Sequence, residues 1–592
     1  MTGLATHPAL AEGWRLHQSG DHVAAAERYH AVLRDQPRNF EAFYLLGLLH
    51  GQNGRFDEAQ FFTGQAVLLN PMSADALFLR SFALGQLERL EEALGCLDRV
   101  LVLNPSMAEA LMNRAALLVR LQRFGPAAQD YERLLTMNPE YPFMPGHLLF
   151  ARLQDCDWRQ FDSEQAAIIA GLQASKKIIA PFHAKPLWLS PEQELNCARI
   201  WTADQFPPQP ALWNGEIYAH ERIRIAYISG DFRPHPVALL LAGVFEHHDK
   251  TRFETIGVSF GPGAQTDIRA RIANSFEHFF DVRSNSDAEA AAMLKDMQVD
   301  IAIDLTGFTE GCRATILAQR PAPVQVNFLG FPGTMGADYI DYLIADAIVV
   351  PQTEHRFYAE NIVTLPGTFM PASCETGSRS FTRAEMGLPD SGFVFCCFNA
   401  SYKIAPQIFD IWMRLLAQAA GTVLWLGRTN EAGRQNLRRE AEVRGVAGER
   451  LIFASYVDSA SDHRARLKLA DLFLDTVPCN AHATAIDALS VGLPVLTCRG
   501  PAFAGRVGES LLHAMGAPEL IAGSTADYEA RALALAHDLQ ALAALKAKLA
   551  RNRQTSALFD TAGFTRNLET AYASMWERHQ SGLPPAGFAV CP

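Results

Sequence analysis

The sequence predicts an α + α/β protein, in which an N-terminal helical solenoid is followed by two doubly wound α/β domains. Three observations lead to this prediction. The first quarter of the chain has a 34-residue period, short β-rich segments alternate with helical ones from residue 222, and the same alternation starts again after residue 390. At 592 residues the chain is also too long for a single hydrophobic core, so we expect three or four domains.

Composition and charge limit the classes of function. The apolar fraction of 49% and the charged fraction of 20% are typical of a folded soluble protein, and the net charge of −12 argues against broad nucleic-acid binding. The segment "MTGLATHPALAEGW" has no basic n-region and no apolar h-region, and no run of about 18 apolar residues occurs, so we expect neither export nor a membrane span. The ten cysteines form no CxxC pair. We expect a cytoplasmic protein with reduced thiols, no membrane partner and no bound metal.

The N-terminal period is carried by three sets of residues in one register. They are Pro37, Pro71, Pro105 and Pro139; Ala25, Ala59, Ala93 and Ala127; and Gly13, Gly47, Ser81 and Ala115. A 34-residue unit of two helices, with small residues at the helix crossing and a proline between units, is the tetratricopeptide pattern. Residues 1–140 are therefore predicted to form tetratricopeptide repeats, whose inner surface can hold an extended peptide or a partner protein.

Residues 141–220 interrupt this period and are expected to form a helical, proline-rich connection that packs on the next domain. A parallel sheet with crossover helices is predicted over residues 221–390. Its strands are expected at 222–229, 253–260, 299–307 and 324–330, with helices at 264–277 and 287–297.

A second sheet of the same kind is predicted over residues 391–592. Its strands are expected at 393–399, 422–428, 450–456, 471–476 and 493–498. Two consecutive doubly wound sheets place a cleft between the carboxyl ends of their strands, where such folds bind ligands. The pattern alone therefore suggests a nucleotide or sugar-nucleotide enzyme with two Rossmann-like domains.

The loops after these strands carry a specific set of motifs. They are "DFRPHPV", "RPAPVQVNFLGFPGTMG", "FNASYKI", "VLWLGR", "LADLFLDTVPCNAHATAIDAL" and "GRVGESLL". In this order they resemble the O-linked N-acetylglucosamine transferase family, tetratricopeptide-bearing inverting glycosyltransferases that modify serine and threonine, and the chain looks like a bacterial-type homologue. The resemblance covers about residues 222–580 together with the repeats. It implies a GT-B-type fold, a UDP-sugar such as UDP-GlcNAc held mainly by the C-terminal half, and no metal.

Two residues match catalytic positions of that family. Lys403, in "FNASYKI", matches its essential lysine, and a fixed cation there stabilises the charge that grows on the β-phosphate as UDP leaves. His235, in "DFRPHPV", matches a histidine near the acceptor and the sugar, where an imidazole can take the hydroxyl proton or orient the acceptor. The alternatives are a solvated surface lysine and a histidine that belongs to a proline-rich turn.

Three further residues are candidates for donor binding. His463 and Arg466, in "SDHRAR", match positions near the uridine, where the imidazole can stack on the base. Their i, i+3 spacing places them on one face of a helix start, although an exposed charged face would show the same spacing. Tyr402 is the weaker candidate for donor binding, since it can simply pack beside Lys403.

The segment "PCNAHATAID", residues 478–487, is predicted to enter a helix whose unpaired N–H groups attract a diphosphate. Its alanines allow close approach to the backbone. We expect Asn480, His482, Thr484 and Asp487 to bind the donor, with His482 and Thr484 as hydrogen-bond donors and Asp487 as acceptor for a ribose hydroxyl. The alternative is an ordinary helix N-cap at Asn480.

The chain also departs from the family pattern. Ala400, Ala460 and Ala483 stand where the family usually has glutamine, lysine and threonine, and each change removes a contact worth about 1 kcal/mol. Better-studied relatives line the repeat groove with asparagines. The equivalent positions here are Leu45, Leu79 and Asn113, of which only one fits.

The leading hypothesis is an inverting, metal-independent glycosyltransferase that moves GlcNAc, or a similar sugar, from a UDP-sugar to a serine or threonine of a protein guided by the repeats. Two alternatives remain open. The first is a repeat-based binding module with a degenerate catalytic part, and the second is the same enzyme with another donor sugar or with asparagine as acceptor.

Overall fold

The computed structural model describes residues 7–372, 379–457 and 459–591. The chain divides into two compact units, Met1–Arg152 and Leu153–Pro592. Within the described residues, no helix combines the length and the apolar character needed to cross a membrane.

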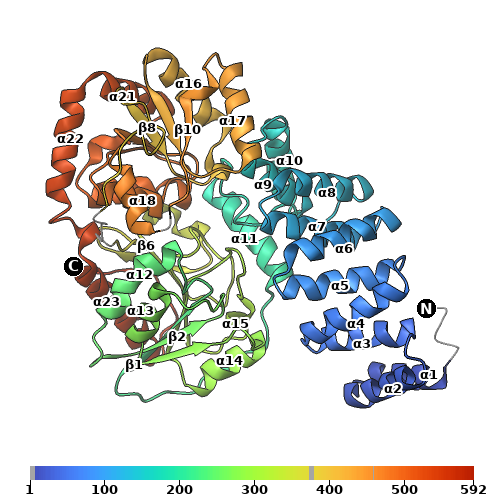
Figure 1. Ribbon diagram of the computed structural model, residues 1–592. Helices are drawn as coiled ribbons and strands as arrows, with labels where there is room; N and C mark the ends of the chain where they lie inside the picture. Colours follow the sequence, from blue (N-terminus) through green and yellow to red (C-terminus); the bar gives the residue numbers. More distant parts are fainter. Residues whose placement is uncertain (1–6, 373–378, 458, 592) are drawn as a thin grey trace. The chain divides into compact units, whose positions relative to one another are not determined.

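The first unit is a stack of antiparallel helix pairs (Figure 1). The helices are α1 (Pro8–Gln18), α2 (His22–Asp35), α3 (Phe40–Gln52), α4 (Phe56–Leu69), α5 (Ala74–Gln86), α6 (Leu90–Leu103), α7 (Ala108–Arg120) and α8 (Phe124–Met137), followed by the start of α9 (Met144–Gln154). Each helix from α1 to α8 has its most extensive contacts with a sequence neighbour. The predicted helical solenoid is confirmed.

The repeat residues explain this stacking. The four periodic alanines are fully buried, and an added Cβ at Gly47 would lie 2.5 Å from Cγ2 of Thr63, so a larger residue cannot enter this helix crossing. Pro37 comes just after the end of α2, and the other periodic prolines follow α4, α6 and α8 in the same way. Because proline cannot continue a helix, each unit ends at the same point.

The second unit begins with α10 (Phe161–Gln173) and α11 (Pro191–Gln205) and continues into a parallel eight-stranded sheet of order β14-β7-β6-β5-β4-β1-β2-β3. Its strands are β1 (Ile223–Ser229), β2 (Phe253–Ser259), β3 (His278–Asp281), β4 (Ile301–Asp304), β5 (Val324–Asn327), β6 (Tyr342–Asp346), β7 (Asn361–Leu365) and β14 (Phe588–Ala589). The helices that connect or cover them are α12 (Pro236–Glu246), α13 (Asp267–Ser275), α14 (Asp287–Asp296), α15 (Thr315–Ala318) and α23 (Thr561–Gln580).

Alternate residues of β1 enter two different cores, as expected for a sheet covered on both faces. Ile225 and Tyr227 belong to a core shared with α12 and α23, whereas Ala226 and Ile228 belong to a core shared with α14 and α15. The first sheet is therefore doubly wound, as predicted.

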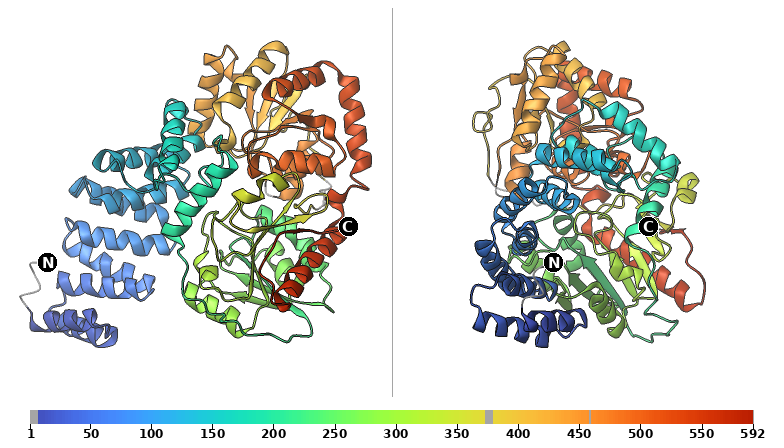
Figure 2. Two further views of the ribbon diagram at one scale, coloured as in Figure 1. Left: turned by 180° about the vertical axis from the view of Figure 1, so that it is seen from behind. Right: turned by 90° about the vertical axis from the view of Figure 1, so that its right-hand side faces the viewer.

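The end of the chain does not follow the prediction that residues 391–592 form one C-terminal half. Helix α23 crosses back to the first sheet, where it lies beside α12, and β14 pairs in parallel with β7 (Figures 1 and 2). The physical reason is the apolar face of α23. Leu568, Tyr572 and Met575 on this face are fully buried in the core of the first sheet.

The second sheet is also parallel and has the order β10-β9-β8-β11-β12-β13. Its strands are β8 (Val394–Cys397), β9 (Val423–Leu426), β10 (Leu451–Phe453), β11 (Leu472–Leu474), β12 (Val495–Cys498) and β13 (Ile521–Ala522). The helices around it are α16 (Pro406–Gln418), α17 (Glu431–Val443), α18 (Ala460–Leu467), α19 (Ala483–Ser490), α20 (Val507–Ala514), α21 (Thr525–His537) and α22 (Leu539–Asn552). This confirms the second Rossmann-like sheet.

Side-chain contacts join the two sheets near the loops that follow their strands. Arg506, just before α20, donates to both carboxylate oxygens of Glu354 at 2.7 and 2.8 Å. Ser510 of α20 donates to Asp346 at the end of β6 at 2.6 Å. A bidentate guanidinium–carboxylate pair fixes orientation as well as distance, so α20 is a firm link between the halves.

Candidate active site

Lys403 lies in the loop after β8, within a short 3₁₀ turn formed by Ser401–Lys403. Its ammonium donates to the carbonyl oxygen of Asn480 at 2.7 Å. Desolvation acts to lower the pKa of Lys403, but Cys479, Tyr402 and Asp475 outweigh it, so that the pKa is raised and the amine stays charged. The fold thus brings the predicted lysine to the segment that precedes α19.

Asp475, directly after β11, organises that segment. Its carboxylate is buried and accepts hydrogen bonds from the backbone N–H of Thr476 at 2.8 Å, the backbone N–H of Ala481 at 2.6 Å and the hydroxyl of Thr497 at 2.6 Å. Burial raises the pKa of Asp475 to about 6. These bonds curl residues 475–481 around one carboxylate and fix the entry to α19.

Asn480 has a structural role in the same loop. Its side-chain amide donates to the carbonyl of Thr476 at 2.8 Å and its oxygen accepts from the N–H of Gly508 at 3.3 Å. The N-cap of α19 is His482, and no side chain caps the helix there. The predicted alternative of an N-cap at Asn480 is therefore wrong, because this side chain is used to tie the loop to α20.

The first turn of α19 keeps unpaired amides. Ala485 and Ile486 donate to the carbonyl of His482 at 3.0 and 3.2 Å. The N–H groups of Ala483 and Thr484 have no acceptor in the part of the chain that the structure describes. Unpaired N–H groups at a helix start attract anions through their dipoles. The N-terminus of α19 therefore offers the unpaired N–H groups that the sequence predicted.

His482 and Thr484 differ in role from the prediction that both are hydrogen-bond donors. Nε2 of His482 lies 3.2 Å from the carbonyl oxygen of Ala504, so a neutral ring places its hydrogen there and leaves Nδ1 as an acceptor. Burial, followed by Lys403, lowers the pKa of His482 well below its usual range. The hydroxyl of Thr484 donates to Asn399 at 2.6 Å. Both side chains thus have only acceptors left for a ligand.

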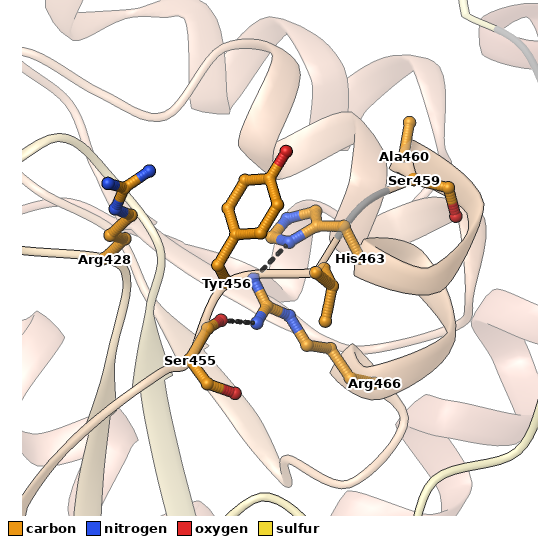
Figure 3. A pocket seen from close by; sticks show the side chains of 8 residues that line it. Arg428, Ser455, Tyr456, Ser459, Ala460, His463 and Arg466 are labelled. Atoms are coloured by element: carbon orange, nitrogen blue, oxygen red, sulfur yellow. Dashed lines mark hydrogen bonds between the residues drawn. The ribbon is translucent and has the colours of Figure 1, made fainter.

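A pocket of about 250 Å³ lies between the loop after β10 and helix α18 (Figure 3). It is lined by Arg428, Ser455, Tyr456, Val457, Ser459, Ala460, His463 and Arg466. Arg466 donates to Nδ1 of His463 at 2.8 Å and to the carbonyl of Ser455 at 2.5 Å. The two predicted uridine-side residues are thus neighbours in one pocket.

The imidazole of His463 in this pocket is neutral. Burial, with help from Arg466 and Arg464, lowers the pKa of His463 to about 4, and burial lowers the pKa of Arg466 to about 10. Asp487 on α19 is 4.0 Å from Nε2 of His463 and 3.4 Å from Arg464. Burial raises the pKa of Asp487 to about 6. An uncharged ring beside an acceptor carboxylate suits a base and a ribose.

His235 belongs to the first sheet and caps the N-terminus of α12. Its Nδ1 accepts from the N–H of Val237 at 3.4 Å and lies 3.5 Å from Asp231. Burial lowers the pKa of His235, with Asp231 opposing the shift. The described contacts do not connect His235 with Lys403 or α19. Its placement near the acceptor stays a prediction.

Tyr402 packs against Phe182, with ring centroids 5.8 Å apart, and burial raises its pKa to about 12. This agrees with the alternative that Tyr402 is a packing residue next to Lys403. The three positions at which the chain departs from the family pattern lie close to the site: Ala400 precedes the turn of Lys403, Ala460 lines the pocket and Ala483 begins α19.

A family model places these features in one group of proteins. The model for glycosyl transferase family 41 matches residues 208–375 and 372–568. The chain belongs to glycosyl transferase family 41. A tetratricopeptide repeat model also matches residues 79–147, within the solenoid.

Two curated proteins are similar in sequence to most of this chain, which corresponds to about half of each of them. A probable UDP-N-acetylglucosamine–peptide N-acetylglucosaminyltransferase SEC of Arabidopsis thaliana is 34% identical over 456 residues, covering 75% of this chain and 46% of that protein. The UDP-N-acetylglucosamine–peptide N-acetylglucosaminyltransferase of Caenorhabditis elegans is 27% identical over 567 residues, covering 72% and 48%. The chain therefore spans about half the length of these curated relatives.

A solved structure resembles the chain over most of its length. It is a mutant O-GlcNAc transferase from Thermobaculum terrenum, with a TM-score of 0.70 and 28% identity, covering 93% of this chain and 99% of that one. This likeness confirms the predicted architecture of tetratricopeptide repeats followed by two Rossmann-like domains of the GT-B type.

Asp475 and Asn399 belong to the site of this family 41 member but were not predicted from the sequence. Asn399 donates to both Asp475 and Thr476 and accepts from Thr484, so it joins the loop after β8 to the loop after β11. The available signal was their position, since each directly follows an apolar strand. Within the described residues, no group of three or more His, Cys, Asp or Glu side chains is arranged to hold a metal ion. Metal independence stays a prediction.

Proposed function

We propose that the chain is an inverting, metal-independent glycosyltransferase that moves GlcNAc from UDP-GlcNAc to a serine or threonine hydroxyl of a protein. One observation carries this proposal. The ammonium of Lys403 lies on the carbonyl of Asn480, and the unpaired amides of Ala483 and Thr484 follow three and four residues later. A cation and two N–H donors on one short segment form a binding site for a diphosphate.

The pocket beside α18 supports UDP as the nucleotide. Its neutral His463 and the buried guanidinium of Arg466 can accept a planar base, and Asp487 is close enough to receive a ribose hydroxyl from the same nucleoside. α18 and α19 are in contact, so the nucleoside pocket and the diphosphate mouth are adjacent. The names of the relatives, which give UDP-N-acetylglucosamine as donor and a peptide as acceptor, agree with this assignment.

The proposed reaction is a single displacement. The acceptor oxygen attacks the anomeric carbon from the side opposite the diphosphate, the bond from that carbon to the β-phosphate oxygen breaks, and both electrons of that bond leave with UDP. Lys403 stabilises this new negative charge. The hydroxyl proton passes to a base, for which His235 is the candidate, since its lowered pKa keeps the imidazole neutral. Taking the proton at Nδ1 replaces the long 3.4 Å contact from the N–H of Val237.

The alternative of a binding module with a degenerate catalytic part rests on Ala400, Ala460 and Ala483, each of which lies at the site but offers only a methyl group. It predicts that the repeats still recruit a partner while the cleft holds no nucleotide. Other donors, including another hexose or a fucosyl donor, and asparagine as acceptor are variants of the enzyme hypothesis.

The deciding experiment offers the purified chain a panel of radiolabelled nucleotide sugars with cell lysate, with and without EDTA. We expect transfer from UDP-GlcNAc to protein, unaffected by EDTA and removed by mild base, which cleaves serine and threonine linkages but not asparagine ones. Transfer from a different donor would replace the sugar only. No transfer from any donor, together with no heat of UDP binding at millimolar concentration, would favour the binding module.

The pH dependence of uridine binding tests the role of Asp487. We expect the affinity for uridine to fall as pH drops through about 6, because the carboxyl then binds a proton and stops accepting from the ribose. Above that pH the affinity should be constant, since His463, with a pKa of about 4, stays neutral throughout. Uridine is used because the terminal phosphate of UDP titrates at about 6 as well.

Asp487→Asn is the matched control for this titration. It should bind uridine more weakly than the unmodified chain at about pH 8 and show no change between about pH 5 and 8. A flat profile for the unmodified chain would contradict the assignment of Asp487 to the ribose. The measurement is isothermal calorimetry in buffers of matched ionic strength.

A further inference from the structure

Lys185 is a buried lysine of this unit that the proposed reaction does not use. It lies between α10 and α11, in the proline-rich connection. Its side chain is only 4% exposed, and its ammonium is 2.9 Å from a carboxylate oxygen of Glu194 on α11 and 4.7 Å above the ring of Phe331. Burying an ammonium group costs free energy unless partners compensate for its lost hydration, so the burial of Lys185 needs an explanation.

The environment of Lys185 connects it with the "GFPGTMG" loop after β5, a motif that the proposed function leaves unexplained. An added Cβ at Gly333 in this loop would lie 2.6 Å from Nζ of Lys185 and 3.5 Å from Glu194. The absence of a side chain at Gly333 therefore makes room for the ammonium. Phe331, from the same loop, supplies the aromatic face on which the ammonium rests.

The connection that carries Lys185 borders the turn of Lys403, because Phe182, three residues before Lys185, packs against Tyr402 with ring centroids 5.8 Å apart. After burial, the charges of Lys403 and Lys185 both lower the pKa of His482, and both act on the thiol of Cys479, whose pKa burial raises. Lys403 comes from the second sheet, whereas Lys185 rests on a loop of the first. Lys403 contacts this segment directly, through the carbonyl of Asn480, and the charge of Lys185 acts on it from the other half.

The hydrogen-bonding capacity of Lys185 is not filled by the protein. An ammonium has three N–H donors. Glu194 accepts one, and no further acceptor for Lys185 occurs within the described residues. The remaining N–H groups of this buried ammonium are unfilled in the described part of the chain, and the amides of Ala483 and Thr484 in the same unit are also unpaired there. Unfilled donors of this kind favour an anionic ligand with several oxygens.

We propose that Lys185 is a second cation for the donor diphosphate, which it binds from the side of the first sheet while Lys403 binds from the side of the second. Glu194 is its positioning residue and holds the ammonium over Phe331. This inference rests on the proposed function, because it assigns a further residue to the same nucleotide site. Lys185 thereby couples nucleotide binding to the connection between α10 and α11.

Calorimetry of the full chain with uridine, UMP and UDP tests this assignment. Lys185→Met should lower the affinity for UDP by about tenfold or more, the scale of a hydrogen bond to a charged group, while the affinity for uridine changes less than about twofold. Lys185→Arg should recover part of the loss. Lys250→Met, which removes an exposed lysine, is the control and should leave all three affinities unchanged.

Two further variants separate a ligand contact from a structural ion pair. The double variant Lys185→Met/Glu194→Gln removes both charges and leaves no unpaired buried carboxylate, and it should show the same selective loss of UDP affinity. Gly333→Ala retains the charge but displaces the ammonium, and it should act in the same direction. Circular dichroism and thermal unfolding confirm that each variant is folded.

The proposal is overturned if UDP affinity is unchanged in Lys185→Met, if it recovers in the double variant, or if uridine affinity falls as much as UDP affinity. These outcomes leave the proposed function intact as long as Lys403→Met still loses UDP affinity. If the unmodified chain does not bind UDP at all, the proposed function and this inference both fail.

Discussion

Lys403→Ala should lower kcat for glycosyl transfer by about 10²–10³-fold, with a much smaller change in KM for the nucleotide sugar. The lysine amine stays charged because the field of Cys479, Tyr402 and Asp475 outweighs its desolvation, and the carbonyl of Asn480 holds it in place at 2.7 Å. A cation that is fixed before the reaction stabilises charge which appears only as UDP leaves. Its loss therefore affects the transition state more than the bound donor.

Lys468→Ala is a matched control for this experiment, since Lys468 is an exposed lysine of the same half. It should transfer sugar at the unmodified rate. Initial rates with saturating donor give kcat, and a donor titration gives KM. A Lys403→Ala variant that retains more than about a tenth of kcat would contradict the proposed role, because even one transition-state hydrogen bond contributes more than that.

Glu569→Ala is expected to release α23 from the first sheet, at a cost of about 3–5 kcal/mol. Glu569 accepts from Nδ1 of His248 at 2.9 Å and from the N–H of Asp249 at 2.7 Å. The His248 side chain is fully buried, and its other nitrogen lies 2.8 Å from the hydroxyl of Tyr227. Truncation leaves a buried histidine without its partner, in a core where water cannot replace the carboxylate.

Hydrogen exchange of the α23 amides measures this effect locally, which avoids the assumption that a protein of several domains unfolds in one step. Glu569→Gln keeps an acceptor oxygen of the same shape and should lose much less protection. If alanine and glutamine reduced protection equally, the charge rather than the hydrogen bonds would hold the helix. If neither did, the apolar face of α23 would suffice to keep it on the sheet.

The helical repeat and more than half of the strands could be predicted from the sequence, whereas β3, β6, β7, β13 and β14 could not. The helical repeat was found because its alanines, small residues and prolines share one register, and the first strands of each sheet because they are apolar runs between helical segments. Length alone does not decide this, since β10 and β11 have three residues each and were predicted, whereas β6 and β7 have five and were not. β13 and β14 have only two residues, and β14 pairs because α23 brings it back to β7.

In the site, too, some features could be predicted from the sequence and others could not. Lys403, His463 and Arg466 stood out because motifs mark them, and the fold places His463 and Arg466 in one pocket and Lys403 at the mouth of α19. Hydrogen-bond direction could not be predicted. Whether Thr484 offers a donor depends on Asn399, which is 85 residues away in sequence, and the tautomer of His482 depends on the carbonyl of Ala504. These are properties of folded neighbours and not of a motif.

The return of α23 and β14 to the first sheet also sets the order in which the catalytic unit can be completed during synthesis. Residues 394–522 contain every strand of the second sheet and leave the ribosome before α23 does. Until residues 561–589 emerge, one face of the first sheet lacks one of its two covering helices, α23, and its edge lacks β14. The nascent half that carries Lys403 and α19 can therefore finish folding first, while the older half presents an apolar face that invites chaperone binding.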